Sequence, residues 1–398
     1  MPAARASGQQ RRRFLWLYAL AWAGGAIAYV PFLTLLLPQR VSEIAGAQSV
    51  DWLSYIAFSG AIAASFGGIF FGWLSDLTKW RTPWIWAGLA LSSVLLLLTL
   101  LAETLPVLVV AVACWQLSLN MMLAPMAAWA GDTVPDGQKG VLGGLLAFAP
   151  ALGALSGALV TIPGLAGGPA RLGFVAGLVA LAVLPALLIG KPRAFPHLMA
   201  PPERAAPDRD PKAVSSPVLR MWIARFLVQI SEAALFAFLL LWFRSLDAAI
   251  TENRTANIFG FVLLAAVPAT LLIGRWADRA ARPVLPLAAC ALVSASGLLV
   301  MALSQTVPLA IAGYVLFAFA AAIFLSLHSA QTLRFLPQPG RRGRDLGIFN
   351  LTNTTPSLVM PWLTLALVPV FGFSALFLVL AGLSVVAALV LLSLVSRG

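Results

Sequence analysis

Polar and ionisable residues recur at helical spacing inside a long apolar stretch of the second half of the chain. Arg225, Gln229 and Glu232 are separated by four and three residues, so they share one face of a helix. Glu232 lies deep in the stretch, where an acid is costly and usually functional. A site of low polarity favours the neutral acid, and opening the site to water would release its proton. We therefore predict that Glu232 is a proton-coupling group.

Other apolar stretches carry residues that could bind a small polar solute. Gln116 and Asn120 offer hydrogen bonds to hydroxyl groups, and Trp22 and Tyr29 offer flat faces on which a sugar ring could stack. The further candidates are Arg225, Gln229, Tyr314, Phe324 and His328. Each type has a structural alternative: aromatic residues at the membrane interface, hydrogen bonds between helices, ring packing, a solvated histidine, or an arginine that extends to the headgroups.

Several kinds of chemistry have no support in the sequence. There is no glycine-rich phosphate loop ending in Lys-Ser or Lys-Thr, so an ATP-driven pump is not expected. No nucleophile and base stand in a recognisable arrangement, so the chain is not expected to be an enzyme. The two histidines, His197 and His328, lack metal-site spacing, and the two cysteines lie inside apolar stretches. We expect no metal and no cofactor.

The composition is that of a membrane protein. Of 398 residues, 61% are hydrophobic and 10% are charged, whereas soluble proteins carry roughly 25% charged residues. Lipid can solvate apolar side chains that water cannot. The net charge of +12 would suggest nucleic acid in a soluble chain, but here the basic residues lie in short loops between apolar stretches. We therefore expect the lipid bilayer, and not nucleic acid, as the partner.

The apolar stretches are long enough to be transmembrane helices, which need about 20 residues. They are twice the length of barrel strands and apolar on all sides, so a barrel is excluded. Twelve stretches meet the criterion: 14–37, 50–73, 82–102, 106–130, 140–163, 171–190, 218–243, 256–276, 283–303, 307–330, 346–370 and 373–394.

Lysine and arginine are distributed unequally between the two sides that this count predicts. One side, with both termini, has 21 of them, and the other side has 4. Positive loops stay in the cytoplasm. We therefore expect a multi-pass protein of the cytoplasmic (inner) membrane with both termini in the cytoplasm, and we expect it to be a monomer.

The chain also repeats itself. Gly72 and Asp76 recur as Gly274 and Asp278 at an offset of 202 residues. A proline-rich, charged segment at 191–217 separates the repeats and is predicted to be a cytoplasmic linker. The predicted domains are thus an N-terminal six-helix bundle at 1–190 and a C-terminal six-helix bundle at 218–398. The alternative is that glycine and proline simply recur at helix ends.

The loops that carry this repeat resemble a known signature. Residues 72–83 and 274–282 are similar to the loop Gly-x-x-x-Asp-Arg/Lys-x-Gly-Arg-Arg/Lys of the major facilitator superfamily. The resemblance implies a cytoplasmic gate formed by Gly72, Asp76, Lys79, Arg81, Asp132, Gly274, Asp278, Arg279 and Arg282. Leu77 replaces the expected base, so Lys79 or Arg81 must supply the positive charge in the first loop.

Two further stretches resemble the glycoside–pentoside–hexuronide and sucrose-symporter branch of this superfamily. They are 132–140 and 344–356, and the second includes Asn350 and Asn353, which complete the candidates for the cavity. This branch also contains pigment-complex assembly proteins. The branch resemblance implies a sugar or glycoside symporter, although the acids that cation-coupled relatives carry in the first two spans are reduced here to Asp51. A facilitator without ion coupling is therefore an alternative.

The resemblance to the superfamily covers the whole chain. It implies an all-α membrane protein with twelve transmembrane helices in two pseudo-repeated six-helix bundles, the major facilitator fold. In that superfamily spans one, four, seven and ten usually line the path. We expect secondary transport of a small-molecule substrate by alternating access, with protons as the coupling ion. Efflux of amphipathic compounds and a non-transporting assembly or receptor protein are the alternatives.

Overall fold

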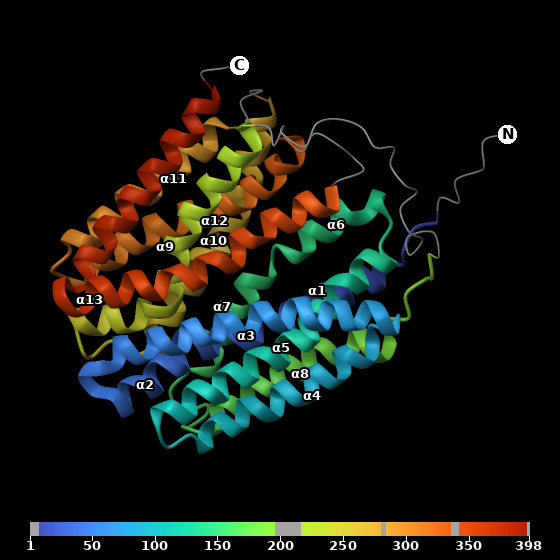
Figure 1. Cartoon of the computed structure of the whole chain (residues 1–398), viewed down its shortest axis with the longest axis horizontal. Helices are drawn as coiled ribbons and strands as arrows, with labels where there is room; N and C mark the ends of the chain where they lie inside the picture. The colour runs from blue at the N-terminus through green and yellow to red at the C-terminus, as the bar shows by residue number, and fades with distance from the viewer. Residues whose placement is uncertain (1–7, 196–215, 280–283, 336–341, 396–398) are drawn as a thin grey trace. The chain divides into compact units, whose positions relative to one another are not determined.

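The computed structural model describes residues 8–195, 216–279, 284–335 and 342–395. All regular secondary structure in these ranges is helical (Figure 1), as an apolar chain in lipid requires, because a helix satisfies its own backbone groups. The linker predicted at 191–217 lies largely outside the described residues.

The first part of the chain contains eight α-helices. They are α1 (Arg12–Pro31), α2 (Leu37–Ala45), α3 (Ser49–Thr78), α4 (Thr82–Leu98), α5 (Leu105–Thr133), α6 (Asp136–Leu146), α7 (Ala149–Val160) and α8 (Ala170–Ile189). A π-helical turn, η1 (Phe32–Leu36), joins α1 to α2, and short 3-10 turns, η2 (Gly46–Gln48) and η3 (Thr99–Leu101), extend α2 and α4.

The second part contains α9 (Ser216–Leu246), α10 (Glu252–Arg279), α11 (Leu285–Leu303), α12 (Val307–Phe335) and α13 (Arg342–Val395). The last of these is bent at Gly372, whose φ of 74° is in the left-handed region that glycine tolerates. The bend falls between the stretches predicted as spans eleven and twelve.

Among the described residues, nine helical segments are long and apolar enough to cross a membrane. The first, Arg12–Thr78, has 67 residues and the last, Thr355–Leu394, has 40, so each is long enough for two crossings. α10 occupies the predicted eighth span. The helices thus follow the predicted stretches within a few residues, apart from two differences that have a local cause.

Both differences occur next to proline, which has no N–H to donate to the carbonyl four residues earlier. The predicted fifth span is divided into α6 and α7, and Pro150 opens α7. The predicted first span does not end at Leu37, since the chain continues through η1 and α2 with Pro38 in the first turn of α2. A π turn before a proline accommodates the missing hydrogen bond.

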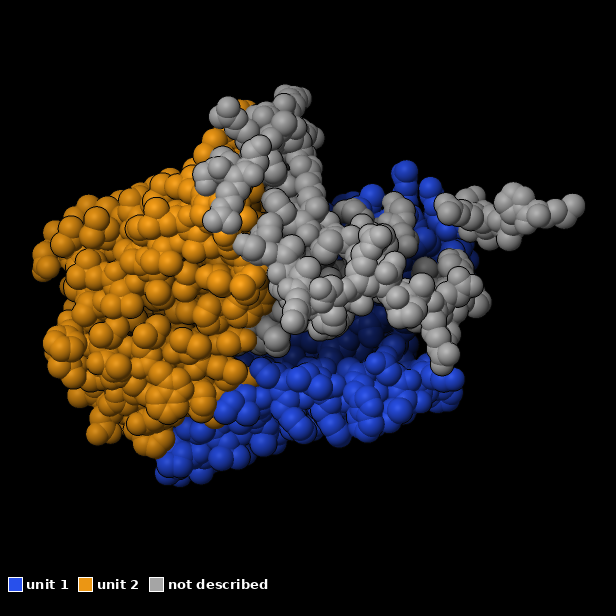
Figure 2. All heavy atoms as spheres, turned by 45° about the horizontal axis from the view of Figure 1, so that its top comes forward, with its two compact units in different colours: residues 1–31, 62–202 blue, residues 32–61, 203–398 orange. Residues whose placement is uncertain are grey.

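Contacts divide the chain into two compact units, coloured separately in Figure 2. Unit 1 comprises Met1–Pro31 and Ile62–Pro202, and unit 2 comprises Phe32–Ala61 and Glu203–Gly398. These units differ from the predicted domains in one segment. Phe32–Ala61, which contains η1, α2 and the start of α3, groups with the second half of the chain.

Unit 1 is held together by helices that approach closely at small residues. α4 packs along α5, and α1 packs on α7 and α8 (Figure 1). At Gly88 of α4, an added Cβ would lie 2.4 Å from the backbone nitrogen of Met122 on α5. At Gly153 of α7 it would lie 2.9 Å from the carbonyl oxygen of Ala26 on α1. Close backbone contact at small residues is the usual way in which helices associate in lipid.

In unit 2, helices also approach closely at small residues. α11 crosses α12 at Gly297 and Gly313, where a Cβ on Gly297 would lie 2.8 Å from the carbonyl oxygen of Gly313. α9 packs on α13, α12 and the segment η1–α2. The rings of Trp242 on α9 and Phe377 on α13 meet edge to face at 4.8 Å between centroids. The segment Phe32–Ala61 also belongs to unit 2. In it, the ring of Phe58 on α3 contacts that of Trp362 on α13 at 5.1 Å between centroids.

Candidate transport path and ion-pair network

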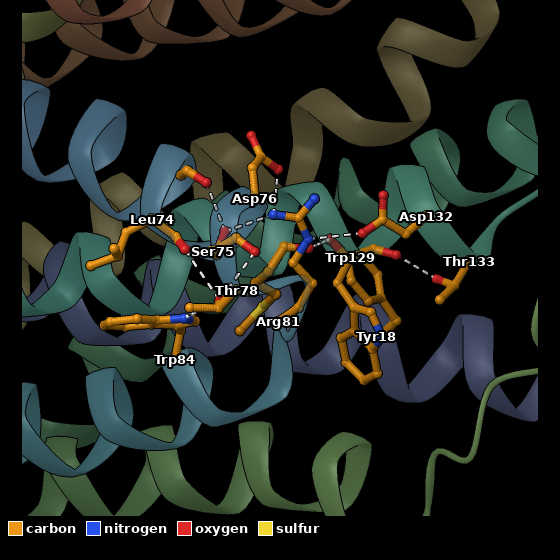
Figure 3. A network of polar contacts seen from close by, with 12 residues as sticks. Tyr18, Leu74, Ser75, Asp76, Thr78, Arg81, Trp84, Trp129, Asp132 and Thr133 are labelled. Carbon is orange, nitrogen blue, oxygen red and sulfur yellow. Dashed lines mark hydrogen bonds and ion pairs between the residues drawn. The ribbon is translucent and has the colours of Figure 1, made fainter. Parts of the chain in front are cut away.

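Arg81 is the centre of a network of polar contacts between α3, α4 and α5 (Figure 3). Its Nη1 lies 2.5 Å from Oδ1 of Asp76 and donates to Oγ of Ser75 at 2.7 Å. Its Nε lies 2.8 Å from Oδ2 of Asp132, at the end of α5. The Ser75 hydroxyl in turn donates to the carbonyl of Gly72 at 2.8 Å. One guanidinium therefore joins the ends of three helices.

The turn between α3 and α4 determines which base enters this network. α3 ends at Thr78, and Lys79 follows with φ of 55°, a left-handed conformation typical of a residue just after a helix. The indole of Trp84 donates to Thr78 Oγ1 at 2.9 Å and fixes the start of α4 against the turn. Arg81 then immediately precedes α4 and points back to α3, whereas the Lys79 side chain is exposed.

The two carboxylates keep Arg81 charged although it is partly removed from water. Burial lowers the pKa of Arg81, but its hydrogen bonds to Asp132 and Asp76 outweigh burial and the net effect is a raised pKa. The side chain of Arg81 is 14% exposed, that of Asp132 is 25% exposed and that of Asp76 is 63% exposed. The Arg81–Asp132 pair is thus the better shielded of the two. Of the two bases that the sequence offers in this loop, the geometry brings Arg81 to Asp76.

The second loop of the repeat is described less completely. Gly274, Asp278 and Arg279 lie in the last turns of α10, but their side chains are outside the described part of the structure. Arg282 is outside the described residues altogether. The predicted gate role of these four residues therefore stays a prediction.

A second polar cluster adjoins the first, and the sequence did not predict it. Gln10, which precedes α1, is buried. Its Nε2 donates to the carbonyl of Thr133 at 2.8 Å and to that of Arg193 at 3.1 Å, and its Oε1 accepts from the backbone N–H of Arg11 and of Arg193. Its backbone exchanges hydrogen bonds with the side chain of Gln138. We call Gln10, Thr133, Gln138 and Arg193 the Gln10 clasp. A lone glutamine before a span gives no sequence signal of such a role.

In unit 2, the polar face of α9 lies beside α12. Arg225 Nε donates to Oε1 of Gln229 at 3.2 Å, and its Nη1 lies 3.5 Å from the carbonyl of Leu325 on α12. Arg225 and Tyr314 are electrostatic neighbours of Glu232. Arg225, Gln229 and Glu232 are all half-buried. Among the described residues this is where intramembrane charges of both signs come together.

The α12 candidates are part of the interior of unit 2. His328 is fully buried, and because the acceptor is a carbonyl, its Nε2 is the donor to Met221 of α9 at 2.8 Å. Phe324 is fully buried, and its ring lies tilted against the His328 ring at 5.5 Å between centroids. Tyr314 is 2% exposed and meets Phe243 of α9 edge to face. These contacts give the three residues a packing role between α9 and α12.

The candidates of unit 1 are placed on α1 and α5. Trp22 and Tyr29 are half-buried on α1, and Gln116 and Asn120 are half-buried on α5. The amide of Asn120 donates to the carbonyl of Gln116 at 2.9 Å, and its Cβ lies 3.1 Å from where a Cβ on Gly67 of α3 would be. Asn120 therefore fills the α3–α5 contact. Because these residues are in unit 1 and Gln229 is in unit 2, their convergence on one cavity stays a prediction.

Two further cavity candidates and one small pocket complete the site residues. Asn350 and Asn353 lie in the first turns of α13, and their side chains are outside the described part of the structure. A mostly apolar pocket between η1, α9 and α10 has a cavity volume of about 10 Å³, which is room for about one water molecule. Ligand sites typically enclose roughly 300–1,000 Å³, so this pocket is small for an organic solute.

Comparisons with known proteins agree with this architecture. The family model described as Major Facilitator Superfamily matches residues 221–397. The bacterial homolog of the human lysosomal transporter Spinster, solved in an inward-facing and occupied conformation, has a TM-score of 0.72 at 13% identity over 96% of each chain. The chain has the major facilitator fold. The all-helical fold class expected from the sequence is thereby confirmed.

Other solved structures with the major facilitator fold match equally completely. The human organic anion transporter MFSD10 (TETRAN) has a TM-score of 0.69 at 16% identity, over 96% of this chain and 99% of that protein. The nucleoside transporter NupG has a TM-score of 0.69 at 13% identity, over 96% of this chain and 99% of that protein. None of the curated protein sequences compared with the chain matches it. All three of these solved structures are of proteins named as transporters and not as enzymes.

Proposed function

We propose that this protein is a secondary transporter that moves a small organic solute across a membrane by alternating access. Its support is the major facilitator fold together with the charged face of α9, where Arg225, Gln229 and Glu232 lie within an apolar helix. An acid and a base are expensive at such depth, and membrane proteins retain them mostly on substrate or ion pathways. This face is the observation that carries the proposal.

The proposed substrate class is a sugar or a glycoside, and the contacts within the protein limit its support. Gln229 already accepts a hydrogen bond from Arg225, and Asn120 packs against α3. The Trp22 ring can stack on a sugar ring, and the Gln116 amide can bind a hydroxyl. A screen for thermal stabilisation by sugars, organic anions and amphipathic compounds tests the substrate class directly.

The second candidate is an organic anion, favoured by the charge of Arg225. A guanidinium in an apolar helix carries a permanent positive charge that attracts a carboxylate. Stabilisation by organic anions and not by sugars would select this candidate. Stabilisation by amphipathic compounds would select efflux, and vesicles that transport none of these classes would favour a non-transporting assembly or receptor protein.

The Arg81 network is proposed to act at the cytoplasmic gate. Arg81 ties Asp76 to Asp132, so the turn after α3 and the end of α5 move as one body. The mostly exposed Asp76 then keeps acceptor capacity for a group outside the network. An Asp at a membrane edge can accept hydrogen bonds from a facing helix N-terminus, which is the contact that a gate between two bundles needs.

Proton coupling is proposed to reside at Glu232, and Glu232→Gln tests it. The amide keeps the shape and the hydrogen-bonding capacity of the acid but does not titrate. In vesicles, the variant should lose accumulation driven by a pH gradient while it retains counterflow exchange of the substrate. The measurements are uptake with an imposed gradient and exchange without one.

The matched control for this experiment is Glu103→Gln, which removes an exposed acid in the loop before α5. It should leave both activities at the level of the unmodified protein. Equal loss of accumulation and of exchange in Glu232→Gln, or loss of neither, would show that Glu232 does not couple protons to transport.

A further inference from the structure

The Gln10 clasp gathers basic residues from two distant parts of the chain. The single oxygen Oε1 of Gln10 accepts the backbone N–H of Arg11 at 3.0 Å and that of Arg193 at 2.9 Å. Nη1 of Arg193 also donates to the carbonyl of Gln9 at 3.0 Å. The ring of Phe195 is buried and lies 3.1 Å from where a Cβ on Gly8 would be. The chain before α1 and the chain after α8 are thus fixed to each other.

The result is a concentrated positive surface on unit 1. It consists of Arg11, Arg12, Arg13, Lys191 and Arg193, all of them exposed. Within the described part of the structure, none of these five side chains forms an ion pair with a carboxylate. The nearby Asp132 is already paired with Arg81. Among the described residues, therefore, no carboxylate is paired with this basic surface.

The position of the basic surface identifies its partner. Arg12 is the first residue of α1, and Lys191 comes two residues after the end of α8 at Ile189. Both helices are candidate membrane spans, so charges at their ends lie at the depth of lipid headgroups. We propose that the basic surface binds the phosphate headgroup of an anionic phospholipid.

The clasp makes this a built site and not only an accumulation of charge. Arg193 belongs to the linker end of the chain, and the hydrogen bonds of Gln10 hold it beside Arg11. The clasp fixes the backbones of these two arginines next to each other, so both side chains start from one place and can reach the same phosphate, which is a group that arginine binds well. Removing the Gln10 side chain changes no charge but removes the oxygen that accepts both backbone N–H groups, so the clasp and the charge can be tested separately.

The test measures thermal unfolding of the purified full-length protein in detergent while dioleoyl phosphatidylglycerol is titrated into the micelles. Phosphatidylglycerol should stabilise the protein, and phosphatidylcholine should not. Each basic residue contributes about a five-fold factor at an anionic surface, so Arg11→Gln with Arg193→Gln should raise the half-saturating phosphatidylglycerol concentration about 25-fold. Arg254→Gln, which removes an exposed arginine on α10, is the control and should leave it unchanged.

Gln10→Ala should also raise the half-saturating concentration, although it removes no charge. An unchanged concentration in Gln10→Ala, or in the double arginine variant, would overturn the proposal. Equal stabilisation by inorganic phosphate at the same concentration would overturn it too, because the ligand would then be a soluble anion. If Gln10→Ala does not fold, the double variant decides, since it retains the clasp glutamine.

Discussion

At the residue scale, the sequence offered two bases for one role. Lys79 and Arg81 both follow Asp76 closely, and spacing alone could not choose between them. The left-handed turn at Lys79 directs its side chain to solvent and returns Arg81 to α3. A guanidinium can satisfy Asp76, Asp132 and Ser75 at once, whereas an ammonium group acts as a point charge. The decisive information was backbone geometry.

The two ion pairs of Arg81 should contribute unequally to stability. A double-mutant cycle between Arg81→Gln and Asp132→Asn should give a coupling of about 1 kcal/mol, because both side chains are partly shielded from water. The cycle with Asp76→Asn should give less than about 0.5 kcal/mol, since the exposed carboxylate of Asp76 is well screened by solvent. Thermal unfolding in detergent at low and high salt measures both. A larger coupling for Asp76 would contradict this ranking.

Other residues of the site could not be predicted. Gln10 lacks a chemical signature, and its partners lie 123 to 183 positions away in the chain. Conversely, the aromatic stripe of α12 was visible from its spacing, but spacing cannot tell a cavity from an interior. Phe324, His328 and Tyr314 are buried against α9 and one another, so packing accounts for their contacts.

At the element scale, most of the helices could be predicted because lipid imposes a length on an apolar segment. α4, α5, α8 and α11 follow their predicted stretches closely. The effect of individual prolines on these helices could not be predicted. Pro38 allows the helix to continue while Pro150 coincides with a break, since the neighbouring turns decide how the missing hydrogen bond is accommodated.

The contact of α4 with α5 depends on the absence of a side chain at Gly88. Gly88→Ala would place a Cβ within 2.7 Å of three backbone atoms of Met121 and Met122, which cannot move without displacing α5. We expect the variant to lose about 1–3 kcal/mol of stability. Thermal unfolding in detergent measures the loss. Gly177→Ala in α8 meets nothing within 4 Å and should be neutral or slightly stabilising. Equal melting temperatures for both variants would contradict close packing at Gly88.

At the scale of the whole molecule, the internal repeat predicted two halves of equal size. The compact units depart from these halves at Phe32–Ala61, which packs with α9, α10 and α13. A sequence repeat depends on which residues recur along the chain, whereas a compact unit depends on which helices are in contact. The two six-helix bundles therefore stay a prediction, and spacing in the sequence did not indicate that Phe32–Ala61 groups with the second half.

The charge distribution of the loops predicts the orientation of the molecule. Because 21 of the lysine and arginine residues are on the side of the termini and 4 are on the other, both termini should be cytoplasmic. A reporter that is active only in the cytoplasm, fused to either end, should be active in both fusions, and the same reporter inserted in the loop at Ala166 should be inactive. Opposite results for the two termini would require an odd number of spans.

The two compact units are connected by unbroken helical backbone as well as by the linker. One boundary lies between Pro31 and Phe32, where α1 passes into the π turn, and the other lies inside α3, between Ala61 and Ile62. A hinge made of loop can rotate freely, but a hinge made of helix stores elastic energy when it bends. The π turn at Phe32–Leu36 has wider backbone hydrogen-bonded rings than α1, and π turns of this kind often occur at functional sites. A hinge at either of these two boundaries would therefore have to bend helix and not loop.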